Sequence, residues 1–171
     1  MTGGFGAVKP LAGTLNGARV LVVEDDPDTL DTLLMLLEAH GAKVCGVLGG
    51  TEALPKLASF RPDLVLSDIA MPGEDGFALI AKIRKRPPSE GGRVPVLAIS
   101  AHVYPEDHQR AFAAGFQGFL NTPVTADALL RAVRGALDVA VPAERRRTER
   151  RSFVIGSAVP ERRMFSRREQ S

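Results

Sequence analysis

The feature that most constrains the fold is a set of five short apolar runs, separated by segments with helical periodicity. The runs lie at residues 19–23, 43–47, 63–67, 94–99 and 116–120. Strands that are apolar along their whole length are buried on both faces, and parallel strands need a helical crossover between them. The sequence therefore predicts an α/β fold, a five-stranded parallel sheet with helices on both faces.

Several of the predicted helices carry signals at their ends. Residues that can cap a helix N-terminus precede the first, third and fifth helices: Asp25 or Asp26, Asp75, and Thr125. Pro27 suits the first turn of the first helix, and Gly41 can end it. Pro55 removes an early hydrogen bond from the second helix, so we expect that helix to be short or bent.

Length and composition fit one domain with a segment on either side. The chain has 171 residues, 44% of them hydrophobic, which is enough for one core but not for a second domain of ordinary size. We expect residues 1–18 to be a flexible leader, residues 19–140 the domain, and residues 141–171 a disordered Arg-rich tail. The sequence contains no apolar stretch of about 18 residues and no N-terminal signal pattern. We therefore expect no membrane span and a cytoplasmic protein.

The charge is distributed unevenly along the chain. The net charge is +2, but residues 141–171 hold nine Arg and four Glu, a balance of +5, so the first 140 residues carry −3. The acidic charge of the domain is expected if it contains a carboxylate pocket, and the basic charge of the tail is expected if it is a docking segment. Besides a purely solvated tail, the alternatives are contact with an acidic protein, with nucleic acid or with a membrane surface.

The chain has one cysteine, Cys45, within the second apolar run. A single cysteine cannot form a disulfide within the chain. Free cysteine behaves as a small apolar side chain and is among the most buried residue types. We expect Cys45 to be a buried thiol that serves packing.

Carboxylates follow two of the predicted strands. Glu24, Asp25 and Asp26 come directly after the first run, and Asp68 comes directly after the third. Because the carboxyl ends of parallel strands meet at one edge of the sheet, these groups are expected to lie together. Like charges packed closely need a bound cation, and Mg2+ is the one we expect. Taken alone, the first group could instead be a helix cap with solvated charges.

Further motifs occur in order along the chain. They are the acidic pair Glu24-Asp25, then Asp68, the loop motifs Met71-Pro72-Gly73 and Asp75-Gly76, and finally Ser100-Ala101. Over about residues 19–137 the chain resembles the receiver domain of two-component response regulators. The resemblance implies the doubly wound, flavodoxin-like receiver fold. After the fifth strand the family has Lys-Pro, whereas this sequence has Thr122-Pro123.

The resemblance implies a phosphoacceptor site at the acidic edge. Asp68 would be the phosphoacceptor. Mg2+ would be coordinated directly by Asp25 and Asp68, through water by Glu24, and by the backbone carbonyl of Ala70. Divalent metal lowers the cost of bringing phosphoryl oxygens up to carboxylates, which is why the site needs it.

The resemblance also implies a second group of residues that bind the phosphate and switch the surface. Ser100, followed by Ala101, would donate its hydroxyl to a phosphate oxygen, unless it only bonds local backbone. Phe119 occupies the position of the aromatic switch residue, or is a plain core side chain. His102 would border the pocket mouth, or is a solvated loop residue.

Thr122 is the position at which sequence and family differ. The family lysine pairs with the acceptor and then with the phosphoryl group, whereas threonine offers only a hydroxyl. A charge-assisted hydrogen bond is roughly twice as strong as a neutral one. Phosphorylation is therefore expected to be weaker or less well coupled to a change of shape.

The functional prediction is a phosphorelay receiver rather than an enzyme. It would accept a phosphoryl group from a histidine kinase or phosphotransfer protein and signal to a downstream partner through the fourth helix, fifth strand and fifth helix. Thr122 leaves two alternatives open. The chain could be a degenerate receiver that acts by binding alone, or a partner or the Arg-rich tail could supply the positive charge that the family lysine provides. A Mg2+-dependent phosphohydrolase would need an acid/base Asp where the chain has Ala70. A nucleic-acid-binding module would bind through its tail whatever residue stood at position 68.

Overall fold

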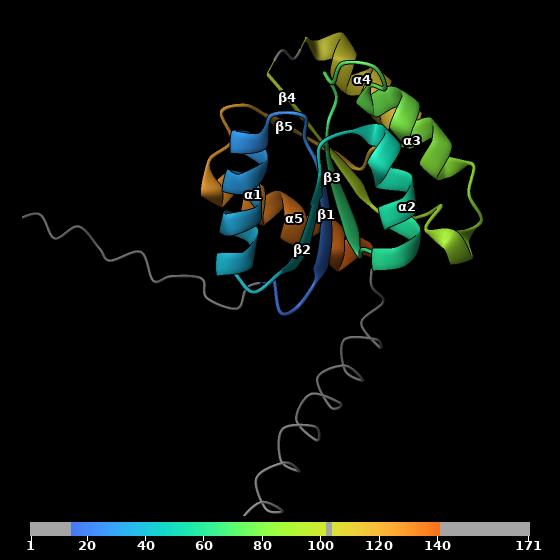
Figure 1. Cartoon of the computed structure of the whole chain (residues 1–171). Helices are drawn as coiled ribbons and strands as arrows, with labels where there is room; N and C mark the ends of the chain where they lie inside the picture. Colours follow the sequence, from blue (N-terminus) through green and yellow to red (C-terminus); the bar gives the residue numbers. More distant parts are fainter. Residues whose placement is uncertain (1–14, 102–103, 141–171) are drawn as a thin grey trace, which may run out of the picture. The chain divides into compact units, whose positions relative to one another are not determined.

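The computed structural model describes residues 15–101 and 104–140, which form an α/β fold around one sheet (Figure 1). Five parallel strands lie in the order β2-β1-β3-β4-β5. The strands are β1 (Arg19–Val23), β2 (Lys43–Val47), β3 (Leu64–Asp68), β4 (Val96–Ser100) and β5 (Gly118–Asn121). The predicted parallel sheet is confirmed.

Helices cover both faces of the sheet (Figure 1). They are α1 (Pro27–Ala39), α2 (Gly50–Phe60), α3 (Gly76–Arg84), α4 (Pro105–Ala114) and α5 (Ala126–Ala140), with a short 3-10 turn, η1 (Pro88–Glu90), before β4. Buried side chains of α1 and α5 pack in one core cluster, and those of α2, α3 and α4 pack in the other. Within the described ranges, no helix is long and apolar enough to cross a membrane.

The predicted helix caps are present. In each case the side chain accepts a hydrogen bond from the backbone N–H three residues later, and the capping residues are Asp26, Asp75 and Thr125. Asp26 is therefore the cap of α1, and Asp25 is left to face the strand edge. The helix α2 runs for 11 residues and continues through Pro55, so it is not short. Proline removes only one backbone donor there, while Ala53 and Leu57 remain buried against the sheet.

Three strands are displaced by one or two residues from the predicted runs. Val94 is buried, but its N–H donates to the carbonyl of Gly91 in a turn, so β4 begins later. Phe116 is likewise buried while its N–H donates to Ala111 at the end of α4. The predicted runs of β4 and β5 began too early because they included these apolar residues, which pack outside the strands. The displacement makes Asp68 and Ser100 the last residues of their strands.

The residues just before β1 belong to the domain. Leu15 is buried, and its N–H donates to the carbonyl of His40 at 3.0 Å, while Gly17 N–H donates to Gly41 at 2.7 Å. The expectation of a flexible leader is therefore wrong for residues 15–18, because an apolar side chain among the glycines anchors them to the end of α1. The rest of the leader, residues 1–14, and the Arg-rich tail, residues 141–171, lie outside the described residues.

Cys45 is only half-buried, which corrects the expectation of a buried thiol. The reason is topological, because β2 is the edge of the sheet and has β1 as its one neighbour. An apolar strand run does not distinguish an edge strand from a central one.

Candidate functional site

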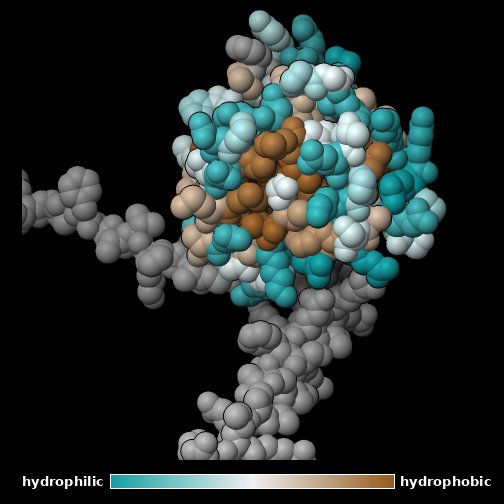
Figure 2. Space-filling model, in the orientation of Figure 1, coloured by the Kyte–Doolittle hydropathy of each residue, from teal (hydrophilic) through white to brown (hydrophobic). Residues whose placement is uncertain are grey.

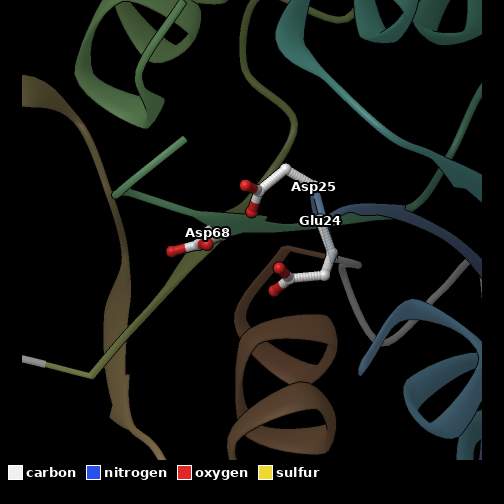
Figure 3. A group of neighbouring side chains, drawn as sticks. All are labelled: Glu24, Asp25 and Asp68. Carbon is white, nitrogen blue, oxygen red and sulfur yellow. The ribbon is translucent and has the colours of Figure 1, made fainter. Parts of the chain in front are cut away.

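Three carboxylates lie together at the carboxyl edge of the sheet (Figure 3). Glu24 and Asp25 directly follow β1, and Asp68 ends the neighbouring strand β3. One oxygen from each side chain lies within 4.8 Å of the other two. The predicted convergence of these residues is therefore present in the structure.

Backbone hydrogen bonds hold this cluster in place. The N–H of Glu24 donates to Val47 of β2 at 3.1 Å, which extends the sheet by one residue beyond β1. The Glu24 side chain is buried, and its Oε1 accepts from the N–H of Asp26 at 3.1 Å. Oδ1 of Asp68 accepts from the N–H of Ala70 at 3.0 Å. Ala70, the expected carbonyl ligand, is thus hydrogen-bonded to Asp68 through its own N–H and is exposed.

Gly76 explains the Asp-Gly motif in the loop after β3. A Cβ at this position would lie 2.6 Å from the backbone oxygen of Asp68 and 2.8 Å from Cα of Ile69. Both are backbone atoms that cannot move without distorting the strand end. Only glycine allows α3 to begin this close to Asp68.

The electrostatics of the cluster are those of an uncompensated acidic site. Burial, with the charges of Asp68 and Asp25 adding to it, raises the pKa of Glu24 to about 7. Burial and then the Asp25 carboxylate raise the pKa of Asp68 as well. Every charged group that shifts these two pKa values is itself a carboxylate. Such a group of oxygens suits a hard divalent cation, because Mg2+ binds through one or two carboxylates and keeps several waters.

Hydroxyl groups follow the next two strands. Ser100 ends β4 and is buried, one residue beyond Ile99, which pairs with Asp68. Thr122 directly follows β5, is half-buried, and donates its N–H to the carbonyl of Ser100 at 3.0 Å. The sheet order therefore places Asp68, Ser100 and Thr122 on three successive strand ends, as expected.

The aromatic position on β5 has a contact that the sequence did not indicate. Phe119 is half-buried, and its ring lies against His108 of α4, with centroids 4.7 Å apart and planes at 33°. No local pattern marks His108, since the contact joins a helix to the following strand. Ala101 is exposed just past β4, and His102 lies outside the described residues.

Comparison with known proteins agrees with this geometry. Residues 20–134 match the model of the response regulator receiver domain. The chain is 42% identical over 121 residues to a 14.6 kDa protein from the sodA1 3′ region of Leptolyngbya boryana, covering 71% of this chain and 91% of that protein. It is 37% identical over 126 residues to the transcriptional regulatory protein GlrR of Escherichia coli K12, covering 74% of this chain but only 28% of GlrR.

Solved structures show the same fold. The chemotaxis protein CheY4 of Vibrio cholerae matches with a TM-score of 0.66 and 29% identity, over 70% of this chain and 98% of that one. The receiver domain of a sensor histidine kinase from Pseudomonas aeruginosa PAO1, solved with a magnesium ion in its active-site cleft, matches with a TM-score of 0.65 and 28% identity, over 71% of this chain and 98% of that one. The chain belongs to the response regulator receiver family, phosphoacceptor signalling modules of two-component systems rather than enzymes.

Proposed function

We propose that this receiver accepts a phosphoryl group on Asp68 from a histidine kinase or phosphotransfer protein. Receiver domains pair with histidine kinases. The observation that carries the proposal is the cluster of Glu24, Asp25 and Asp68, with oxygens within 4.8 Å of one another at the end of adjacent strands. The phosphorylated domain would signal through the surface of α4, β5 and α5 to a downstream protein.

The proposed reaction is an in-line displacement at phosphorus. A carboxylate oxygen of Asp68 attacks the phosphohistidine, a P–O bond forms as the P–N bond breaks, and the imidazole leaves with the electron pair and takes up a proton. The hydrogen bond from Ala70 N–H to Oδ1 orients the carboxylate and leaves its other oxygen for attack. Asp68 is half-buried, so the chain would cover one side of the acyl phosphate that results.

The acidic cluster supports a magnesium site in this proposal. Asp25 and Asp68 would coordinate Mg2+ directly, Glu24 through water, and Ala70 through its backbone carbonyl. When bound, the ion supplies positive charge between the attacking carboxylate and the phosphoryl oxygens. The raised pKa of Glu24 fits this arrangement, because burial and then the neighbouring carboxylates disfavour its charged form until a cation is present.

The remaining residues of the edge would bind the phosphoryl group and transmit its arrival. The hydroxyl of Ser100, beside Ala101, would donate to a phosphoryl oxygen. Thr122 would add a second hydroxyl in place of the family lysine, and Phe119 would respond as the aromatic residue of the switch. His102 at the pocket rim stays a prediction from the sequence.

A second candidate is a degenerate receiver that binds its partner whether or not Asp68 is phosphorylated. Thr122 favours this alternative, since it cannot provide the positive charge that holds the phosphoryl group in other receivers. Both candidates keep the same fold and the same acidic site.

We also propose the extent and setting of the module. The receiver domain would span residues 19–140 together with the packed residues 15–18, with the leader and the Arg-rich tail outside it. The tail would contact an acidic protein or nucleic acid through its nine Arg residues. The proposed location is the cytoplasm, where histidine kinases present their phosphohistidine.

Incubation with acetyl phosphate, with and without Mg2+, followed by intact-mass measurement tests the proposal. The chain should gain the mass of one phosphoryl group only when Mg2+ is present, and Asp68→Asn should gain none. Asp26→Asn is the matched control, because asparagine also caps a helix and Asp26 is outside the carboxylate cluster. A gain that persists in Asp68→Asn excludes the assignment, and no gain in any variant selects the degenerate receiver.

A further inference from the structure

The edge strand β2 is surrounded by apolar side chains. Figure 2 shows a hydrophobic patch on the face where Figure 1 places β2 between α1 and α2. All three elements carry half-buried apolar side chains, namely Val44 and Cys45 on β2, Leu34 on α1 and Leu54 on α2. Nearby in sequence, Leu48 is 47% exposed and Met35 is 70% exposed. Such an edge attracts another strand unless charge, proline or a bulge protects it.

The backbone of β2 has an alternating pattern of hydrogen bonding. Lys43 N–H donates to Ala18 at 2.8 Å, and the carbonyl of Val47 accepts from Glu24 at 3.1 Å, so both residues direct their backbone groups toward the β1 side. Alternate residues of a strand direct these groups to opposite edges. Val44 and Gly46 therefore direct their N–H and C=O groups away from the sheet.

This pattern is self-complementary about Cys45, the central residue of β2. If two copies of β2 run antiparallel about a two-fold axis at Cys45, Val44 of each copy lies opposite Gly46 of the other. These are the two residues whose backbone groups face outward, so each pair exchanges two hydrogen bonds. Cys45 then lies opposite Cys45 of the second copy as a non-hydrogen-bonded pair. A two-fold axis gives an isologous contact that closes at the dimer.

The side chains fit the same register. A Cβ at position 46 would lie 2.8 Å from the side chain of Leu34, so glycine lets α1 pack closely over the strand. Val44 and Gly46 share one face, and Val44 of the second copy would cover the space beside Gly46. Lys43, the one charged residue of β2, would face Val47 rather than another lysine.

We propose that the chain forms a two-fold dimer through β2, in which one sheet continues across both copies. The contact uses the β2 edge, whereas β5 and the surface proposed to signal lie at the opposite edge of the sheet. The dimer therefore leaves the output surface open in both copies. The dimer does not depend on phosphorylation of Asp68, so it can be tested independently of the proposed function.

Oxidative cross-linking of the full chain tests the register. In a non-hydrogen-bonded pair the two Cys45 Cα atoms are about 4.5 Å apart, within the roughly 4.4–6.8 Å that a disulfide spans. Mild oxidation should give a covalent dimer of the wild type and none of Cys45→Ser. The matched control is Cys45→Ser combined with Lys43→Cys, which places an exposed thiol four residue steps, about 13 Å, from its mate. Equal cross-linking in that control would mean random collision and overturn the register.

The mass in solution tests the dimer itself. Light scattering over a concentration series should show the wild type approaching twice the monomer mass. Val44→Pro removes an outward N–H from each copy and, among residues 15–101 and 104–140, no hydrogen bond, so it should stay folded and be monomeric. Thermal unfolding checks its fold, and if it does not fold the cross-linking result decides. A wild type that stays monomeric, or a folded Val44→Pro that still dimerises, overturns the proposal.

Discussion

The carboxyl edge of the sheet has two halves with different polar side chains. The first half follows β1 and β3, and the second follows β4 and β5. The first half carries Glu24, Asp25 and Asp68, all with oxygens close enough to share one cation. Among the described residues, the second half carries the hydroxyls of Ser100 and Thr122 and the amide of Asn121, without a charged group at these strand ends. The carboxylate cluster can therefore be present at one part of the edge while the neighbouring strand ends depart from the family pattern at Thr122.

The two halves also differ in their charge. Burial and mutual repulsion raise the pKa values of Glu24 and Asp68, so a bound cation would stabilise the charged carboxylates of the first half. In other receivers a lysine in the second half supplies a fixed positive charge, and a threonine hydroxyl cannot replace it. We therefore expect metal binding and phosphoryl acceptance to be separable from switching in this chain.

The largest effect within the first half is expected from Asp25→Asn. Removing one carboxylate charge from the cluster should weaken Mg2+ binding about tenfold or more, if it matters at least as much as a hydrogen bond to a charged group, which contributes about 1.5–3 kcal/mol. Isothermal titration calorimetry measures this directly. Asp26→Asn should change the affinity much less, because that side chain caps α1. Equal losses in the two variants would show that only net charge matters and that the cluster is not the site.

The raised pKa of Glu24 predicts how stability depends on pH without Mg2+. Its pKa is about 7 in the folded chain against an ordinary 4.5, so the folded state holds this proton more tightly. The stabilisation is fully present below pH 4.5 and is lost as pH rises to about 7, amounting to at most about 3 kcal/mol. Denaturant unfolding should show this fall in the wild type and a flatter curve in Glu24→Gln. Mg2+ should stabilise more at pH 8 than at pH 5, and the opposite order would contradict the account.

The smallest effect is expected in the second half, at the contact between His108 and Phe119. An aromatic pair contributes about 0.5–1.5 kcal/mol, so His108→Ala should lower the free energy of unfolding by roughly 1 kcal/mol or less. His108→Phe keeps the ring contact and should retain most of that stability. Both variants should bind Mg2+ like the wild type. A change in Mg2+ affinity would mean that the two halves are coupled through α4 after all.

Much of the fold and of the acidic site could be predicted because both depend on short-range patterns. Strand runs, helix caps such as Asp75, and the rule that parallel strands end at one edge were enough to bring Asp25 and Asp68 together. The same local patterns could not separate residues buried in turns, such as Val94, from residues in strands. They also could not show that β2 is an edge strand and that Cys45 is half-exposed.

Contacts between distant segments left no signal in the sequence. The half-buried guanidinium of Arg84 donates to the carbonyls of Gly92, Val94 and Gly115 and to Oε1 of Gln117. It joins the end of α3 to the segments that enter β4 and β5. An arginine at a helix end is ordinarily a solvated charge, so only the tertiary structure shows this role. The ring contact of His108 is of the same kind.

The most direct measurement compares amide hydrogen exchange of wild type and Thr122→Lys with and without a Mg2+-supported beryllofluoride mimic of the phosphoryl group. In both proteins, exchange around Asp68 should slow when the mimic is added, because Glu24, Asp25 and Asp68 lie close enough to share the cation that supports it. Over α4, β5 and α5 the wild type should change little and Thr122→Lys clearly more, since the lysine restores a charged partner for the occupied site. A wild type that already shows the full change over α4, β5 and α5 would contradict the claim that the two halves are only weakly coupled.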